Sequence, residues 1–306
     1  MVQKAYATLL TNPTYLAGAL VLHHCLVSVG SKYPLVVMVT PSFPQEAREV
    51  IRKRGIMLRD IDHLNPEKDV HHLSDHDARF SDTWTKLRCF ELEEYDRLVM
   101  LDSDMIIMRN MDELMDLELP RDWIAAAHVC ACNPRKLPHY PADWVPANCA
   151  HTSMVHPEAL SSPPTITESS PRPYTQLNSG TVVLHPSHEL SEGLKHFLST
   201  SPLVPTFSFP DQDLLSAFFK GKWKPLPWCY NALKPLRLIH KPMWRDEEVR
   251  CLHYILKDKP WHQPPGTGGE FEEVNKWWWD RYERVAAELR SSDAEGWELV
   301  SSMLRN

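Results

Sequence analysis

The sequence predicts an α/β fold in which a mostly parallel sheet is covered by helices. Through about the first 130 residues, short apolar runs typical of buried strands alternate with segments of helical periodicity. The composition, 43% hydrophobic and 24% charged, is that of ordinary globular domains. A chain of 306 residues can also bury a sizeable core.

The first half of the chain supplies this alternation. A strand expected at 4–10 leads through Asn12-Pro13, a pair that favours a helix start, into an almost wholly apolar helix at about 14–29. Runs of the same kind predict further strands at 35–39, 56–58, 98–101, 106–108 and 123–127, and helices at 45–54 and from about 82 to 95.

The second half continues less regularly. Ser187 and Pro210 are typical helix starts, each followed by apolar residues at helical spacing. Further strands are predicted at 181–184 and at 249–255. Asn178-Ser-Gly180, before the first of these, is either a plain turn or a place where the backbone comes close to a ligand, because glycine lacks a side chain. We expect one domain at 1–262, and a hinge with a helix of about 272–289 in the tail at 263–306. The three adjacent tryptophans of this helix, Trp277 to Trp279, cannot all face one way. We therefore expect the tail to pack on the domain or on a partner, such as a second copy of the chain in a homodimer.

Composition excludes several classes of protein. A formal charge of −7 and a pI of about 6.1 do not suit a nucleic-acid binder. The apolar stretch at 17–22 is too short to span a bilayer, and the first residues do not resemble a signal peptide, so we expect a cytoplasmic protein. Seven cysteines at irregular spacing do not indicate a disulfide scaffold.

The most informative motif is Asp102-Ser-Asp104, which ends the apolar run at 98–101. Alternate residues of a strand point the same way, so both carboxylates can face one partner. Such a pair is costly beside apolar residues unless a cation neutralises it, and carboxylate oxygens suit Mg²⁺ or Mn²⁺. The alternative is a plain Asp-Ser-Asp turn.

Two other stretches carry alternatives. Cys130, Cys132, Cys149 and His151 could bind zinc or form a disulfide, but their spacing matches no standard zinc finger, and free thiols are the simpler interpretation. The polar stretch at 65–81 is interpreted as a surface loop, with a flap over a site as the alternative.

Short motifs in a fixed order resemble the family 8 retaining glycosyltransferases. The motifs are Ala7-Thr-Leu9-Leu-Thr11-Asn12, Thr85-Lys86-Leu87, Asp102-Ser-Asp104, Asn178-Ser-Gly180, Asp211-Gln212, Tyr230-Asn231, and His253 with Lys259-Pro-Trp261. This resemblance implies a GT-A fold, a UDP-sugar donor and usually Mn²⁺, with Mg²⁺ as the alternative.

The resemblance also implies site residues. The metal ligands would be Asp102, Asp104 and His253. Asp211 and Gln212 would lie at the donor sugar, as the catalytic candidates. The donor would be bound by Leu9, Thr11, Asn12, Tyr15, Lys86, Asp102, Ser103, Asn178, Ser179, Gly180 and Lys259.

Within the family, the chain is nearer the galactinol synthase-like branch, as Tyr33-Pro34, Met243-Trp244-Arg245 and the cysteine-bearing stretch indicate. A glycogenin-like enzyme would carry an acceptor tyrosine before the late strand, and 231–250 contains none. Ser208 replaces the acid that many members have three residues before Asp211. We expect transfer of galactose or glucose from a UDP-hexose to a hydroxyl acceptor, such as inositol, another polyol or a glycan. The alternatives are a nucleotide-sugar-binding protein without turnover, a glycogenin-like protein glucosyltransferase and a metal phosphohydrolase.

Overall fold

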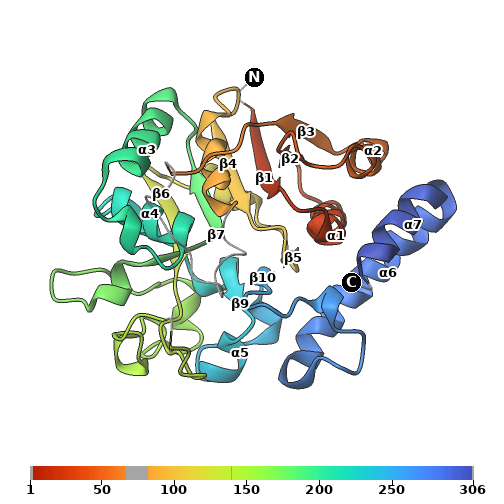
Figure 1. Ribbon diagram of the computed structural model, residues 1–306. Coiled ribbons are helices and arrows are strands. Elements are labelled where there is room, and N and C mark those ends of the chain that lie inside the picture. The colour runs from red at the N-terminus through yellow and green to blue at the C-terminus, as the bar shows by residue number, and fades with distance from the viewer. Residues whose placement is uncertain (1–2, 67–81, 139, 305–306) are drawn as a thin grey trace.

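The computed structural model describes residues 3–66, 82–138 and 140–304. Within these ranges, a seven-stranded sheet forms the centre of the molecule, in the order β3-β2-β1-β4-β7-β6-β8 (Figure 1). Its strands are β1 Lys4–Leu10, β2 Leu35–Val39, β3 Met57–Asp60, β4 Arg97–Leu101, β6 Ile124–His128, β7 Leu177–Leu184 and β8 Trp223–Pro225. The predicted loop or flap at 65–81 falls almost wholly outside the described residues.

The sheet is mostly parallel, as predicted. Strands β3, β2, β1 and β4 run parallel to one another, and so do β6 and β8, whereas β7 is antiparallel to β4 and β6. Side chains of β4 alternate between two cores: Val99 and Leu101 belong to one, Leu98 and Met100 to the other. Burial on both faces explains why the apolar run of β4 is continuous from Leu98 to Leu101.

Helices cover both faces. Helices α1 (Leu16–Ser28), α2 (Gln45–Lys53) and α6 (Glu272–Ser292) contribute to one core, and α3 (His188–Thr200) and α4 (Pro210–Phe218) to the other. The helix predicted from about 82 to 95 is a 3-10 helix, η3, at Thr83–Glu91. The side chain of Ser187 accepts a hydrogen bond from the backbone N–H of Leu190, which confirms the predicted start of α3.

A second, three-stranded sheet lies beside the first, in the order β5-β10-β9 among the described strands. It consists of β5 (Met105–Ile107), β9 (Ala232–Leu233) and β10 (Cys251–His253). His253 pairs with Met105 across the antiparallel β5–β10 ladder. Strand β10 therefore ends next to Asp102-Ser-Asp104, the motif that follows β4.

The plain-turn interpretation of Asn178-Ser-Gly180 was wrong: these residues lie inside β7, which begins at Leu177, and do not form a turn before it. The close approach of the backbone to a ligand stays a prediction. The β6–β7 register shifts there, because Ala126 pairs with Val182 while Ala127 pairs with Asn178. Residues 179–181 therefore bulge away from β6. Bulges of this kind are frequent beside functional sites, where they re-aim side chains.

The C-terminal tail forms two helices, α6 and α7 (Ala294–Met303), the second of which the sequence analysis missed. The three adjacent tryptophans diverge, as expected. Trp278 is fully buried and stacks on Tyr282, whereas the indole N–H of Trp279 donates to the backbone oxygens of Pro260 and Gln263. Within the described ranges, no helix is both long enough and apolar enough to cross a membrane.

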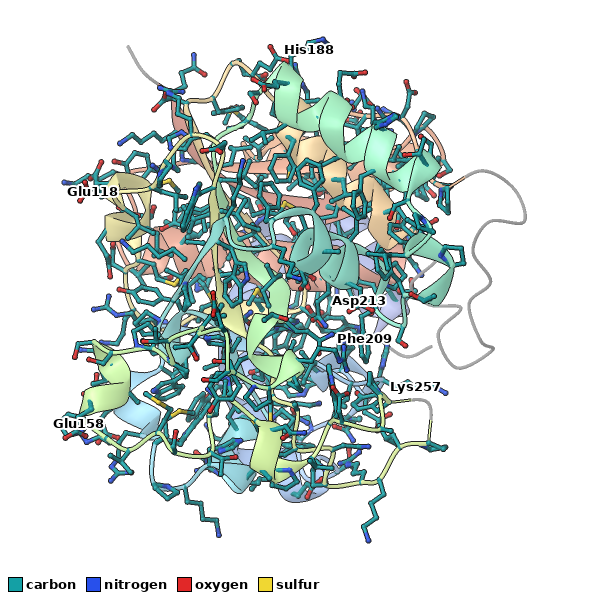
Figure 2. The ribbon with its side chains drawn as sticks, turned by 90° about the vertical axis from the view of Figure 1, so that its left-hand side faces the viewer. Glu118, Glu158, His188, Phe209, Asp213 and Lys257 are labelled. Carbon is teal, nitrogen blue, oxygen red and sulfur yellow. The ribbon has the colours of Figure 1, made fainter. Side chains whose placement is uncertain are left out.

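Asp213 stabilises the chain entering α4. Its Oδ2 accepts hydrogen bonds from the backbone N–H groups of Ser208 (2.8 Å) and Phe209 (2.9 Å). Figure 2 labels Phe209 and Asp213 near each other at the start of this helix. Oδ1 is buried without a hydrogen-bond partner. Burial raises the pKa of Asp213 from 3.8 to about 6.

This pKa predicts a pH-dependent effect of Asp213→Asn. Between about pH 4 and 6 the unfolded chain releases the proton that the folded state keeps, so the wild type loses stability as the pH rises. An amide keeps the two acceptor contacts and never ionises. We expect Asp213→Asn to gain up to about 2–3 kcal/mol relative to the wild type between pH 4 and pH 7.5, measured by urea unfolding.

The control is Asp122→Asn. Asp122 is exposed and paired with Lys222, which lowers its pKa, so its replacement should give no gain at pH 7.5. An Asp213→Asn variant that is equally destabilised at both pH values would show that hydrogen bonding, and not protonation, governs this position.

Candidate active site

Asp102, Asp104 and His253 converge at the end of β4. The Nε2 atom of His253 lies 3.5 Å from Oδ2 of Asp102 and 3.3 Å from Oδ1 of Asp104. One ligand atom from each residue lies within 4.8 Å of the others. Two carboxylates and an imidazole placed in this way form a set of ligands that suits a divalent cation such as Mn²⁺.

Strand pairing brings these residues together. The backbone N–H of Asp102 donates to the carbonyl oxygen of Gly180 (2.9 Å), and the N–H of Tyr254 donates to that of Asp104 (2.9 Å). A Cβ atom on Gly180 would lie 2.4 Å from the ring of His253, and one on Gly18 would lie 2.3 Å from the carbonyl oxygen of Ser103. Only glycine permits these approaches, by β7 to the histidine and by α1 to the acidic motif.

A chain of side-chain hydrogen bonds connects His253 to the candidate sugar site. Nδ1 of His253 lies 2.9 Å from Oδ1 of Asn231, whose amide nitrogen donates to Oδ1 of Asn178 (2.8 Å). The amide nitrogen of Asn178 in turn donates to Oε1 of Gln212 (3.0 Å). Asn231 fixes the orientation of the imidazole and leaves Nε2 facing the acids. Asn231 belongs to the Tyr230-Asn231 motif, but its role beside His253 was not predicted.

Lys86, from η3, connects two acids of the site. Its ammonium lies 2.6 Å from Oδ1 of Asp102 and 2.8 Å from Oδ2 of Asp211, which is in the first turn of α4. Burial alone would lower the pKa of Lys86, but Asp102 and Asp211 outweigh burial and raise it. Lys86 therefore stays charged at neutral pH.

Lys259 neutralises the other side of the acidic pair. Its ammonium lies 2.5 Å from Oδ2 of Asp104 and also donates to the carbonyl oxygen of Tyr254 (2.8 Å). Burial opposes ionisation of Asp104, but Lys259 and His253 prevail and lower its pKa well below the usual range. For Asp102 the balance is reversed: burial, together with the negative charges of Asp104 and Asp211, outweighs Lys86 and His253 and raises its pKa. Cationic compensation at Asp102 is thus incomplete.

One cavity of about 930 Å³ joins these groups. Of the residues that the sequence assigns to the donor, metal and catalysis, the cavity is lined by Leu9, Thr11, Asn12, Tyr15, Lys86, Asp102, Ser103, Asp104, Asn178, Ser179, Asp211, Gln212, His253 and Lys259. Gly180 lies behind the wall, against His253. Ser208 is not among the lining residues, and its neighbour Phe209 is.

Another part of the cavity wall comes from the segment between β6 and β7, residues 129–176, which we call the excursion. Its Tyr140 and Trp144 form an aromatic cluster with Phe209, in which the rings of Trp144 and Phe209 stack at a centroid distance of 5.2 Å. This aromatic wall was not predicted, because Phe209 lies far along the chain from Tyr140 and Trp144.

The cysteine group in the excursion differs from the prediction. All seven cysteines, each of which the structure describes, are free, so the disulfide alternative is wrong for this structure. The fourth group near Cys130, Cys132 and Cys149 is His240 and not His151. Nε2 of His151 instead lies 3.3 Å from the backbone oxygen of His128.

Comparisons with known proteins agree with this geometry. The model of glycosyl transferase family 8 matches residues 7–264. Galactinol synthase 1 of Ajuga reptans is 30% identical over 312 residues, which cover 98% of this chain and 87% of the relative. Galactinol synthase 4 of Arabidopsis thaliana is 30% identical over 314 residues, 99% of this chain and 89% of the relative.

Solved structures share the fold. The galactosyltransferase LgtC, in complex with donor and acceptor sugar analogues, superposes with a TM-score of 0.64 at 15% identity, over 94% of this chain and 99% of LgtC. The glycosyltransferase GlyE of Streptococcus pneumoniae gives a TM-score of 0.58 at 17% identity, over 95% of this chain and 64% of GlyE. The predicted GT-A fold is confirmed.

The match of the family model covers most of the chain, and the galactinol synthases cover nearly all of it. The chain therefore belongs to glycosyl transferase family 8 and is a sugar-transferring enzyme.

Proposed function

We propose that this enzyme is a metal-dependent retaining hexosyltransferase. Its donor would be a UDP-hexose, with galactose or glucose as the sugar, and its acceptor a hydroxyl of a small polyol or glycan. The observation that carries the proposal is the convergence of Asp102, Asp104 and His253, within 4.8 Å, in a cavity that also contains two buried lysines. Metal, diphosphate and sugar can be accommodated there together.

The donor set supports a divalent cation. Hard carboxylate oxygens with one imidazole suit Mn²⁺, with Mg²⁺ as the alternative. When bound, the cation would neutralise charge on the departing diphosphate. Asp102, Asp104 and His253 would hold it, and Asn231 would fix the ring of His253. Lys259, beside Asp104, would supply a further positive charge to the phosphates.

The first strand supports a nucleoside subsite. Leu9, Thr11, Asn12 and Tyr15 line the cavity where β1 ends and α1 approaches. Asn12 Oδ1 accepts from the backbone N–H of Thr14 (3.0 Å), which fixes the turn. Tyr15 contacts the edge of Trp261 at 5.3 Å between ring centroids. A uracil ring would find one apolar, partly aromatic wall in this part of the cavity.

The donor sugar would lie near the start of α4. Asp211 and Gln212 face the cavity there, Asp211 paired with Lys86 and Gln212 hydrogen-bonded to Asn178. Engagement of both side chains favours a positioning role: they would orient the sugar hydroxyls while the bond from the anomeric carbon to the diphosphate breaks. Same-face attack by the acceptor hydroxyl would retain the configuration.

The acceptor would meet the excursion wall. Tyr140, Trp144 and Phe209 offer aromatic faces, which suit the apolar C–H face of a sugar or cyclic polyol. The relatives named galactinol synthases favour galactose as the transferred sugar and inositol as the acceptor.

A donor-by-acceptor screen tests the proposal. UDP release and product mass, measured with Mn²⁺ and with chelator, should identify one UDP-hexose and one acceptor class, and NMR should show the retained anomer. Tight UDP binding without turnover would instead identify a binding protein. Free sugar as the sole product would identify a hydrolase, and self-labelling would identify a glycogenin-like enzyme.

Asp104→Asn should lower kcat/KM for UDP-hexose by at least about 10²-fold, because it removes one charge from the metal site while keeping the side-chain shape. A Mn²⁺ titration of UDP release measures this. Asp280→Asn removes an exposed acid paired with Lys276 and should keep activity within about twofold. Wild-type turnover in Asp104→Asn would refute the metal assignment.

Gly180→Ala tests the position of His253. The added Cβ would lie 2.4 Å from the imidazole, so the ring has to shift. We expect the half-saturating Mn²⁺ concentration to rise by about tenfold or more. Gly193→Ala is the matched control, because its Cβ would meet two ring atoms of Phe218, at 3.1 and 3.5 Å, and no residue of the site. An unchanged Mn²⁺ requirement in Gly180→Ala would mean that His253 does not hold the metal.

A further inference from the structure

Three thiols and one imidazole meet at the base of the excursion. The Nε2 atom of His240 lies 3.5 Å from Sγ of Cys130, 3.3 Å from Sγ of Cys132 and 3.6 Å from Sγ of Cys149. All four atoms lie within 4.8 Å of one another. Cys132, Cys149 and His240 are buried, and Cys130 is partly exposed.

These separations fit tetrahedral zinc. Zn–S bonds of about 2.3 Å and a Zn–N bond of about 2.0–2.1 Å hold nitrogen and sulfur about 3.6 Å apart. Three thiolates and one imidazole form a soft donor set, which suits zinc and not the hard cations expected at Asp102 and Asp104. The set is complete with four protein ligands, as in structural zinc sites, and leaves no open position for a substrate.

The local fold explains what such an ion would do. Among its described residues, the excursion has no helix longer than the 3-10 turn at Arg172–Thr175, and its own core consists of Val129, Ala131, Cys132, Trp144 and Cys149. His240 belongs to a different segment, at the end of α5 (Leu236–Ile239). Figure 1 shows α5 beside the excursion, below the main sheet. A long segment with so small a core gains most from a metal cross-link.

We propose that Cys130, Cys132, Cys149 and His240 bind a structural zinc ion that ties the excursion to α5. Cys130 and the α5 residues Leu238 and Ile239 also line the large cavity. The ion would therefore hold the wall that faces the acceptor, a consequence that rests on the proposed function.

A neighbouring histidine provides the control. The ring of His151 lies 5.6 Å from that of His240, between centroids, and its Nε2 faces the backbone oxygen of His128. His151 therefore neighbours the site without belonging to the ligand set.

The test measures metal content, with no need for turnover. The full chain, expressed with zinc and dialysed against EDTA to strip weakly held ions, should retain about one zinc per chain. The Co²⁺-loaded protein should show the thiolate charge-transfer and visible bands of tetrahedral coordination. Zinc-free preparations whose three thiols all react with a thiol reagent in the folded state, and which take up no Co²⁺, would overturn the proposal.

Variants identify the ligands. Cys130→Ser changes the partly exposed ligand and therefore perturbs packing least. Cys130→Ser and His240→Ala, each made singly, should weaken zinc retention by at least about 100-fold. His151→Gln and Cys229→Ser, outside the ligand set, should retain zinc fully. Zinc lost from His151→Gln but kept by His240→Ala would refute this set.

Asp104→Asn distinguishes the two metal sites. It should keep zinc and the Co²⁺ thiolate spectrum even though sugar transfer fails. If Asp104→Asn instead loses the retained zinc, and the Co²⁺-loaded wild type shows no thiolate bands, the ion occupies the acidic site and the proposal is overturned.

Discussion

The burial of two carboxylates at the end of β4 is the constraint on which the site depends. Asp104 and the less buried Asp102 cannot remain ionised together without nearby positive charge. Lys86 reaches them from η3 and Lys259 from the segment after β10, and His253 faces both. The compensating groups come from elements far apart in sequence. The positions of η3, β10 and the segment after β10 relative to β4 are thus tied to the same electrostatic requirement.

Much of the fold is predictable from the sequence, because the central strands are apolar on both faces. The strand at 35–39 was predicted to the residue. Prediction failed where tertiary contacts decide the local structure. Asn178-Ser-Gly180 has turn chemistry, yet it lies in β7, because Asn178 pairs with Ala127 of β6 and the backbone N–H of Asp102 donates to the carbonyl oxygen of Gly180. The tail helix α7 carries weak periodicity, and its Val300 is buried in the core that contains α1 and α6.

The candidate site was predictable to the extent that its groups are adjacent in sequence or belong to an ordered set of motifs. Asp102 and Asp104 are two residues apart, and His253 was assigned only through family resemblance. Sequence spacing does not predict which residues meet when they come together only in the folded chain. Asn231 reaches His253 from 22 residues away, and His240 lies 91 residues after Cys149, whereas the neighbouring His151 was the obvious but wrong partner. The cytoplasmic location and the homodimer stay predictions.

The excursion leaves and re-enters the sheet at one point. β6 and β7 are antiparallel neighbours, and the backbone N–H of Val129 donates to the carbonyl oxygen of Gln176 (3.2 Å), which closes the insertion at its base. Changes in the length or sequence of the insertion therefore need not alter the register of any strand. The part of the cavity wall that the excursion forms can therefore be replaced as a unit, by evolution or by grafting, while the strands that carry the acids and the glycine of β7 stay in place.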